Sequence, residues 1–109
     1  MNFAHSQEGN FHLLQTSGRL DINSSAEFEK EIQTGLDSGQ SIIVIDMTDV
    51  EYISSAGLRS ILIAAKAARS LDSEIRFCGV TGMVDEVFTV SGFKKMFKIF
   101  DSLKAATAE

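Results

Sequence analysis

The sequence predicts an α/β fold on a mixed, mostly parallel β-sheet, with the element order ββαβαβαβα. From residue 11 onward, short apolar segments of strand length alternate with amphipathic segments of helix length. Strands separated by helices pair in parallel through right-handed crossovers. A polar turn at residues 7–10, Gln-Glu-Gly-Asn, joins two strands directly and adds an antiparallel edge. A chain of 109 residues suits one hydrophobic core, so we expect a single domain over residues 1–109.

The first elements are the edge hairpin and one helix. Alternating polar and apolar residues predict strands at residues 2–6 and 11–16. Ser24 and Glu27 have the spacing of a capping box, in which each side chain binds a free amide at a helix start. Apolar residues at intervals of four then predict a helix over residues 25–37.

The second half of the chain continues the alternation of strand and helix. An uninterrupted apolar run within residues 41–47 is typical of a central strand that is covered on both faces. Apolar residues gathered on one face predict a helix over residues 56–71. The remaining predicted elements are a strand at residues 74–79, a helix at 82–90, a strand at 97–100 and a short helix that Ser102 caps and that ends at Ala106.

Charge and hydropathy argue against several classes of partner. The 15 acidic and 10 basic side chains give a net charge of −5, and no basic cluster could follow a phosphate backbone, so direct nucleic acid binding is not expected. No apolar run approaches the roughly 20 residues that cross a bilayer, which predicts no membrane insertion and a cytoplasmic protein. Cys78 is the sole cysteine, so no internal disulfide forms, and its apolar neighbours predict a buried thiol.

One segment carries a specific motif. Residues 46–58, Asp-Met-Thr-Asp-Val-Glu-Tyr-Ile-Ser-Ser-Ala-Gly-Leu, run from the central strand to the second helix. Gly-Arg-Leu-Asp at residues 18–21 precedes them, and Val-Asp-Glu-Val-Phe at residues 84–88 follows with Ser91 and Gly92. Together these motifs resemble the STAS domain of sulphate transporters and anti-sigma-factor antagonists, from about residue 11 to near the end of the chain. The resemblance implies a single-domain STAS-like fold.

The resemblance also implies a function. In the bacterial antagonists of this family, a serine two residues before a Gly-Leu pair is phosphorylated by an anti-sigma kinase. Matching Ser-x-Gly-Leu places that serine at Ser55. The chain would then bind an anti-sigma factor with serine kinase activity while unphosphorylated and be released when phosphorylated, and a serine phosphatase would reverse the modification. The family commonly has Asp before this serine and Ser or Thr after it, whereas this chain has Ser54 and Ala56, so Ser54 is the second candidate acceptor.

The chemistry of the segment agrees with this interpretation. Ser55 is predicted to precede a helix whose free amides and dipole tolerate an added phosphate. Phosphorylation adds roughly −1.5 to −2 charges at pH 7, which would weaken a partner docked over the loop. Small Ala56 and Gly57 would leave room for that partner. On spacing alone, the simpler interpretation is that Ser54 and Ser55 serve only as helix caps, and the family resemblance reverses that preference.

A second segment is expected beside the first. Asp21, Asn23 and Ser24 follow the second strand, and the carboxyl ends of neighbouring strands are where sites form in such sheets. Related antagonists use this region for partner binding, although Asn23 and Ser24 could also simply form a turn with a helix cap. The predicted partner-binding residues are Asp21, Asn23, Ser24, Ser54, Ser55, Ala56, Gly57, Leu58 and Arg59.

Two other classes of function find less support in the residues. Asp46 at the end of the central strand invites comparison with a response-regulator receiver, but the early strand ends in Thr-Ser-Gly without the acidic pair that holds Mg²⁺. Asp46 is therefore expected to organise its loop. An enzyme is not indicated either, since Ser55 lacks the Gly-x-Ser-x-Gly elbow and no phosphate loop or metal-binding pair occurs. We predict no catalytic residues, metal or cofactor, and solvated side chains for His5 and His12.

The alternative role keeps the fold and changes the partner. A stand-alone STAS subunit of a lipid ABC transporter, or a module of a sensory scaffold complex, would have the same motifs. Copurification with a membrane ATPase would favour this alternative, whereas recognition by an anti-sigma kinase favours the first. The sequence leaves the oligomeric state open between a monomer and a weak dimer.

Overall fold

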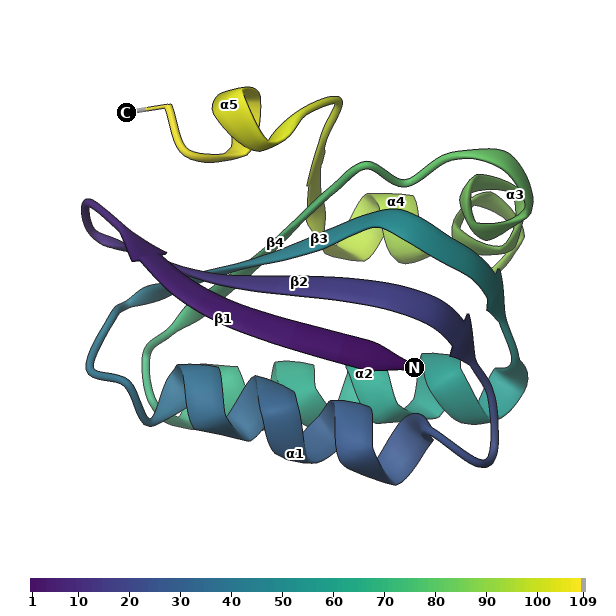
Figure 1. The fold of residues 1–109 in the computed structure, drawn as a ribbon, viewed down its shortest axis with the longest axis horizontal. Coiled ribbons are helices and arrows are strands. Elements are labelled where there is room, and N and C mark those ends of the chain that lie inside the picture. Colours follow the sequence, from purple (N-terminus) through teal and green to yellow (C-terminus); the bar gives the residue numbers. More distant parts are fainter. Residues whose placement is uncertain (109) are drawn as a thin grey trace.

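A five-stranded mixed sheet forms the centre of the computed structural model, which describes residues 1–108 (Figure 1). The strands lie in chain order, and they are β1 (Asn2–Glu8), β2 (Phe11–Leu20), β3 (Ile42–Ile53), β4 (Glu74–Cys78) and β5 (Lys98–Phe100). β1 is antiparallel to β2, and every other neighbouring pair is parallel. The predicted mixed sheet with an antiparallel edge is confirmed.

Helices cover the two faces of this sheet. They are α1 (Ser25–Leu36), α2 (Ser55–Ser70), α3 (Gly82–Val90), α4 (Phe93–Met96) and α5 (Leu103–Ala106). Figure 1 shows α1 and α2 side by side under the sheet and α5 above its other face. The predicted order ββαβαβαβα is confirmed, with α4 as an additional single turn between α3 and β5. No helix among residues 1–108 has the length and apolar character that crossing a bilayer requires.

The alternation of side chains along β3 explains why it is the central strand. Ile43 and Ile45 are fully buried in the main core with α1 and α2. Val44 points the other way, into a smaller cluster that Ala106 of α5 closes. Burial on both faces requires an apolar run without polar interruption. The run within residues 41–47 is therefore apolar because both faces of this strand are covered, as predicted.

Two strands extend further than their sequence pattern indicates. β2 continues from the predicted end at residue 16 to Leu20, and β3 continues from residue 47 to Ile53. The second half of β3 pairs only with β2, because β4 ends opposite Asp46. Its polar side chains at Thr48, Asp49 and Glu51 are exposed, so they do not disturb the core. The loop predicted before the second helix is correspondingly reduced to Ser54.

The predicted capping box at the start of α1 is wrong. Ser24 is the residue before α1, but its side chain accepts no hydrogen bond from the helix. Its hydroxyl donates instead to the Arg19 carbonyl at 2.8 Å and accepts from the Asp21 amide at 3.0 Å. The turn from β2 into α1 uses this side chain, so Ser24 is buried and fixes the path of the chain.

The histidines were predicted to be solvated, and for His12 this is wrong. β1 and α1 close over β2, and His12 is buried there. Its Nε2 lies 2.8 Å from Nδ1 of His5, and His5 Nε2 lies 3.1 Å from a carboxylate oxygen of Glu31 on α1. Burial, and to a smaller extent the neighbouring His5, lowers the pKa of His12 below its usual value of 6.5. The pair thus ties the edge strand to the first helix.

Candidate functional site

The candidate site lies where β2 and β3 end side by side. Leu20 pairs with Ile53, and the Ser54 amide donates to the Leu20 carbonyl at 2.9 Å. This bond joins the start of the β2–α1 turn to the residue before α2. The two predicted segments therefore meet at one edge of the sheet.

The two candidate serines have different surroundings. Ser54 is the N-cap of α2, and its hydroxyl accepts a hydrogen bond from the Gly57 amide at 3.3 Å. Ser55 is the first residue of α2, one residue earlier than the predicted helix start. Its side chain is exposed, and its hydroxyl makes no hydrogen bond within residues 1–108. The structure thus gives Ser54 a local structural role and leaves Ser55 accessible.

Gly57 is needed for packing inside the molecule. A Cβ atom at this position would lie 2.7 Å from Leu20 Cγ and 3.0 Å from both Ile53 Cγ1 and the Leu20 carbonyl oxygen. The first turn of α2 therefore rests directly on the ends of β2 and β3. Gly57 is buried, so it does not contribute to the space open to a partner as predicted. Ser24, also predicted to contact a partner, is buried as well.

An apolar depression begins one helical turn after the exposed serine, at Leu58. Leu58 of α2 with Val87 and Val90 of α3 lines a shallow depression of about 340 Å³. Val90 is 88% exposed, and Ile22 in the β2–α1 turn is 75% exposed. Apolar side chains that adjoin one another at the surface indicate a binding surface, and Leu58, Val87 and Val90 adjoin in this depression. Spacing alone did not reveal Val90, because its i+3 relation to Val87 is equally typical of a core face.

We give the name Ser55 surface to three neighbouring parts: Ile22 in the β2–α1 turn, the exposed Ser55 and Arg59 at the start of α2, and the depression residues Leu58, Val87 and Val90. Two arginines lie in or beside this surface, one held by neighbouring side chains and one without an ion pair in the described residues. Arg19 lies over the Tyr52 ring at 4.2 Å, with its Nε 4.0 Å from an Asp21 carboxylate oxygen. Arg59 on α2 is exposed and forms no ion pair within residues 1–108.

Asp21 and Asn23, both predicted to contact a partner, have different surroundings in the structure. The Asp21 carboxylate accepts a hydrogen bond from the Asn23 amide at 3.0 Å, so it organises its own turn. Its side chain is only 28% exposed, whereas Asn23 is exposed. Ala56 and Leu58 are half-buried on the first turns of α2. Asn23, Ser55 and Arg59 are therefore the most accessible of the predicted partner-binding residues.

Comparison with known proteins identifies the family. The family model of the STAS domain matches residues 3–106. The chain belongs to the STAS domain family. A protein of Bordetella bronchiseptica, BtrV, which is assigned as an anti-sigma factor antagonist, is 36% identical over 91 residues, covering 84% of this chain and 78% of that protein. The resemblance inferred from the sequence motifs is confirmed.

Solved structures show the same fold. A Thermotoga maritima protein assigned as an anti-sigma factor antagonist has a TM-score of 0.87 at 23% identity and covers 95% of this chain and 90% of that chain. The Bacillus cell fate determinant SpoIIAA in its phosphorylated form has a TM-score of 0.70 at 15% identity and covers 96% of each chain. At these identities the likeness concerns the arrangement of helices and strands.

Asp46 was expected to organise a loop, but it lies within β3 and bonds to Thr48 of the same strand, where the pairing with β2 is irregular. One of its carboxylate oxygens accepts hydrogen bonds from the Thr48 amide at 3.0 Å and the Thr48 hydroxyl at 2.6 Å. Burial, reinforced by the nearby Asp46 carboxylate, raises the pKa of the Cys78 thiol to about 12. Across residues 1–108, no group of three or more His, Cys, Asp or Glu side chains is placed to hold a metal ion.

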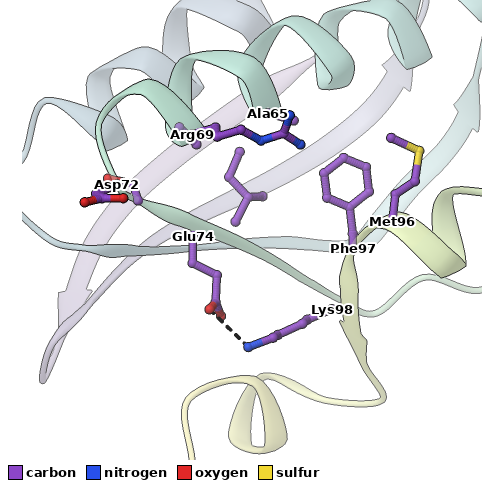
Figure 2. A pocket seen from close by; sticks show the side chains of 10 residues that line it. Ala65, Arg69, Asp72, Glu74, Met96, Phe97 and Lys98 are labelled. Carbon is purple, nitrogen blue, oxygen red and sulfur yellow. Dashed lines mark hydrogen bonds and ion pairs between the residues drawn. The ribbon is translucent and has the colours of Figure 1, made fainter.

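A larger hollow of the STAS domain lies away from the Ser55 surface. It has a volume of about 440 Å³ and lies between the end of α2 and the start of β5 (Figure 2). Figure 2 shows Arg69 and Phe97 on its sides, with Glu74 held to Lys98 at 3.1 Å below them. At about 1.5 Å per helical residue, Arg69 is roughly 20 Å along α2 from Ser55. The hollow and the exposed serine are thus separate features of the domain.

Proposed function

We propose that this STAS domain, acting as a single domain over residues 1–109, is a cytoplasmic anti-sigma-factor antagonist that works by partner switching. Unphosphorylated, it binds an anti-sigma factor with serine kinase activity through the Ser55 surface. The kinase transfers the γ-phosphoryl group of ATP to Ser55 Oγ, which loses its proton, and ADP leaves. The phosphorylated domain is released, and a serine phosphatase hydrolyses the phosphate ester to restore the hydroxyl.

The accessibility of the Ser55 hydroxyl is the observation that carries this proposal. A kinase must align the acceptor oxygen with the γ-phosphate, so the side chain must be exposed and free to turn. Ser55 is exposed at the start of α2, whereas Ser54 is half-buried and bonded to the Gly57 amide. Modification of Ser54 would place a phosphate on a partly covered side chain that is already engaged as the N-cap of α2. This contrast favours Ser55 as the acceptor.

The assigned role of the relatives supports the choice of partner. BtrV is assigned as an anti-sigma factor antagonist, and SpoIIAA has been solved in a phosphorylated form. The Ser55 surface suits a protein partner, because it combines the small Ser55 hydroxyl with the exposed apolar side chains of Ile22 and Val90. Apolar contact of this kind is a common source of binding energy between proteins.

The same surroundings explain why phosphorylation would weaken binding. A phosphate carries roughly −1.5 to −2 charges at pH 7 and is strongly hydrated. Covering it with a partner's apolar surface would remove that water without supplying a compensating charge. Unphosphorylated Ser55 has no such penalty. The switch would thus act through charge and desolvation at the docking surface, and it needs no change of fold.

The test combines phosphopeptide mapping with affinity capture from the source bacterium. Wild-type, Ser55→Ala, Ser55→Asp and, as the matched control, Ser54→Ala baits are compared. We expect phosphate on Ser55 in the wild-type and Ser54→Ala proteins, constitutive capture of a kinase by Ser55→Ala, and weak capture by Ser55→Asp. Phosphate on Ser54 alone, or capture of a membrane ATPase equally by all four baits, would contradict the proposal.

A further inference from the structure

Arg59 has a defined position relative to the exposed serine. It lies four residues after Ser55 on α2, and side chains at this spacing are neighbours on one face of a helix, with Cβ atoms about 5–6 Å apart. Both side chains are exposed. The spacing brings the guanidinium within reach of a group attached to the Ser55 hydroxyl.

The other cation at this edge is already engaged. Arg19 lies over Tyr52 and beside Asp21, whereas Arg59 forms no ion pair within the described part of the chain. A guanidinium binds phosphate oxygens in a two-pronged geometry that an ammonium group does not provide. An acidic group followed at i+4 by a basic one is also the favourable order along a helix. Arg59 is therefore the cation best placed to meet a phosphate on Ser55.

We propose that Arg59 binds the phosphate of phosphorylated Ser55 and so forms the second half of the switch, an inference that rests on the proposed function. Phosphorylation then has two effects on the Ser55 surface. It adds an anion at Ser55, and it withdraws an exposed cation from any acidic group that the partner presents. Arg59 is a positioning residue for the phosphate and takes no part in the transfer reaction.

The test measures the ionisation of the phosphate itself. Phosphoserine is installed at position 55 by genetic incorporation, without a kinase or partner, and its second pKa is followed by phosphorus NMR. A nearby cation stabilises the dianion and lowers this pKa. We expect the value in Arg59→Gln to be higher than in the wild-type chain by roughly 0.15–0.4 pH unit. Arg59→Lys should restore part of the difference.

The matched control is Lys66→Gln, which removes an exposed cation of the same helix far from Ser55. It should leave the second pKa of the phosphate unchanged. An equal value in the wild-type chain and Arg59→Gln, or an equal shift in Lys66→Gln, would overturn the proposed contact. Because no partner is present in this experiment, a failure of partner switching would not change its result. Likewise, absence of the Arg59 contact would not exclude partner switching.

Discussion

Substitution of Gly57 by alanine tests how the Ser55 surface is positioned. In an open helical position, alanine is more favourable than glycine by about 1 kcal/mol. At position 57 the added Cβ would approach Leu20 Cγ to 2.7 Å and the Leu20 carbonyl oxygen to 3.0 Å. Leu20 is fully buried, and its carbonyl accepts the Ser54 amide, so neither group moves freely.

The expected result is a reversal of the usual alanine preference. Overpacking of this kind costs about 1–3 kcal/mol, which outweighs the gain in helix propensity, so Gly57→Ala should lower the free energy of unfolding by about 1 kcal/mol. Urea unfolding followed by circular dichroism provides the measurement, provided that the slope with denaturant stays constant. Lys66→Ala and Lys66→Gly form the control pair in an exposed position of the same helix, where alanine should be more stable. A Gly57→Ala protein as stable as the wild type would refute the packing argument.

Three further predictions concern single side chains. Ser54→Ala should lower the free energy of unfolding by about 1 kcal/mol through loss of the N-cap, and Ser55→Ala by clearly less; equal losses in urea unfolding would contradict the division of roles. The pKa of His12 is lowered in the folded state, so below pH 6.5 the unfolded chain binds more protons than the folded one. The free energy of unfolding should therefore be highest above that pH and should fall below it. His12→Gln should flatten this dependence in pH-resolved unfolding, and an unchanged slope would count against the buried pair. Cys78, with its pKa raised to about 12, should resist thiol reagents near neutral pH until the chain unfolds, and rapid labelling of the native protein would disprove its burial.

The elements with a clear period were predictable from the sequence. Ile43, Val44 and Ile45 indicated a central strand because both of its faces are covered, and Phe28 and Ile32 indicated α1 because one helical face meets the sheet. An uninterrupted apolar run corresponds to a strand that is buried on both faces, and apolar residues at i+4 spacing correspond to a helix that is buried on one face. The motif at residues 46–58 likewise led to the STAS domain family, which the family model confirms.

The predictions that were wrong concern local sequence patterns that are compatible with two different structures. The polar second half of β3 resembles a loop, but it remains a strand because β2 supplies hydrogen bonds on one side and its side chains point to water. Ser24 has the spacing of a cap, yet its hydroxyl binds Arg19 and Asp21 in the turn. His12 is buried only because β1 and α1 approach from distant parts of the chain. Such outcomes depend on tertiary neighbours.

The candidate site was only partly accessible to sequence reasoning. The motif singled out Ser55 and Ser54 together. Only the structure shows that the Ser54 hydroxyl already accepts a hydrogen bond from the Gly57 amide. Gly57 was expected to keep a surface open and instead closes an interior contact. Val90 was not expected on the surface at all, since nothing in its spacing separates an exposed valine from a buried one.

The most direct measurement of the central claim is the affinity of the partner kinase for the domain with and without phosphate on Ser55, measured by titration calorimetry. The account predicts that phosphorylation weakens binding by about tenfold or more. A single guanidinium neutralises only part of the phosphate charge of roughly −1.5 to −2, and burying the remainder in an interface costs more than the 1.4 kcal/mol that corresponds to tenfold. Equal affinity of the two forms would contradict it.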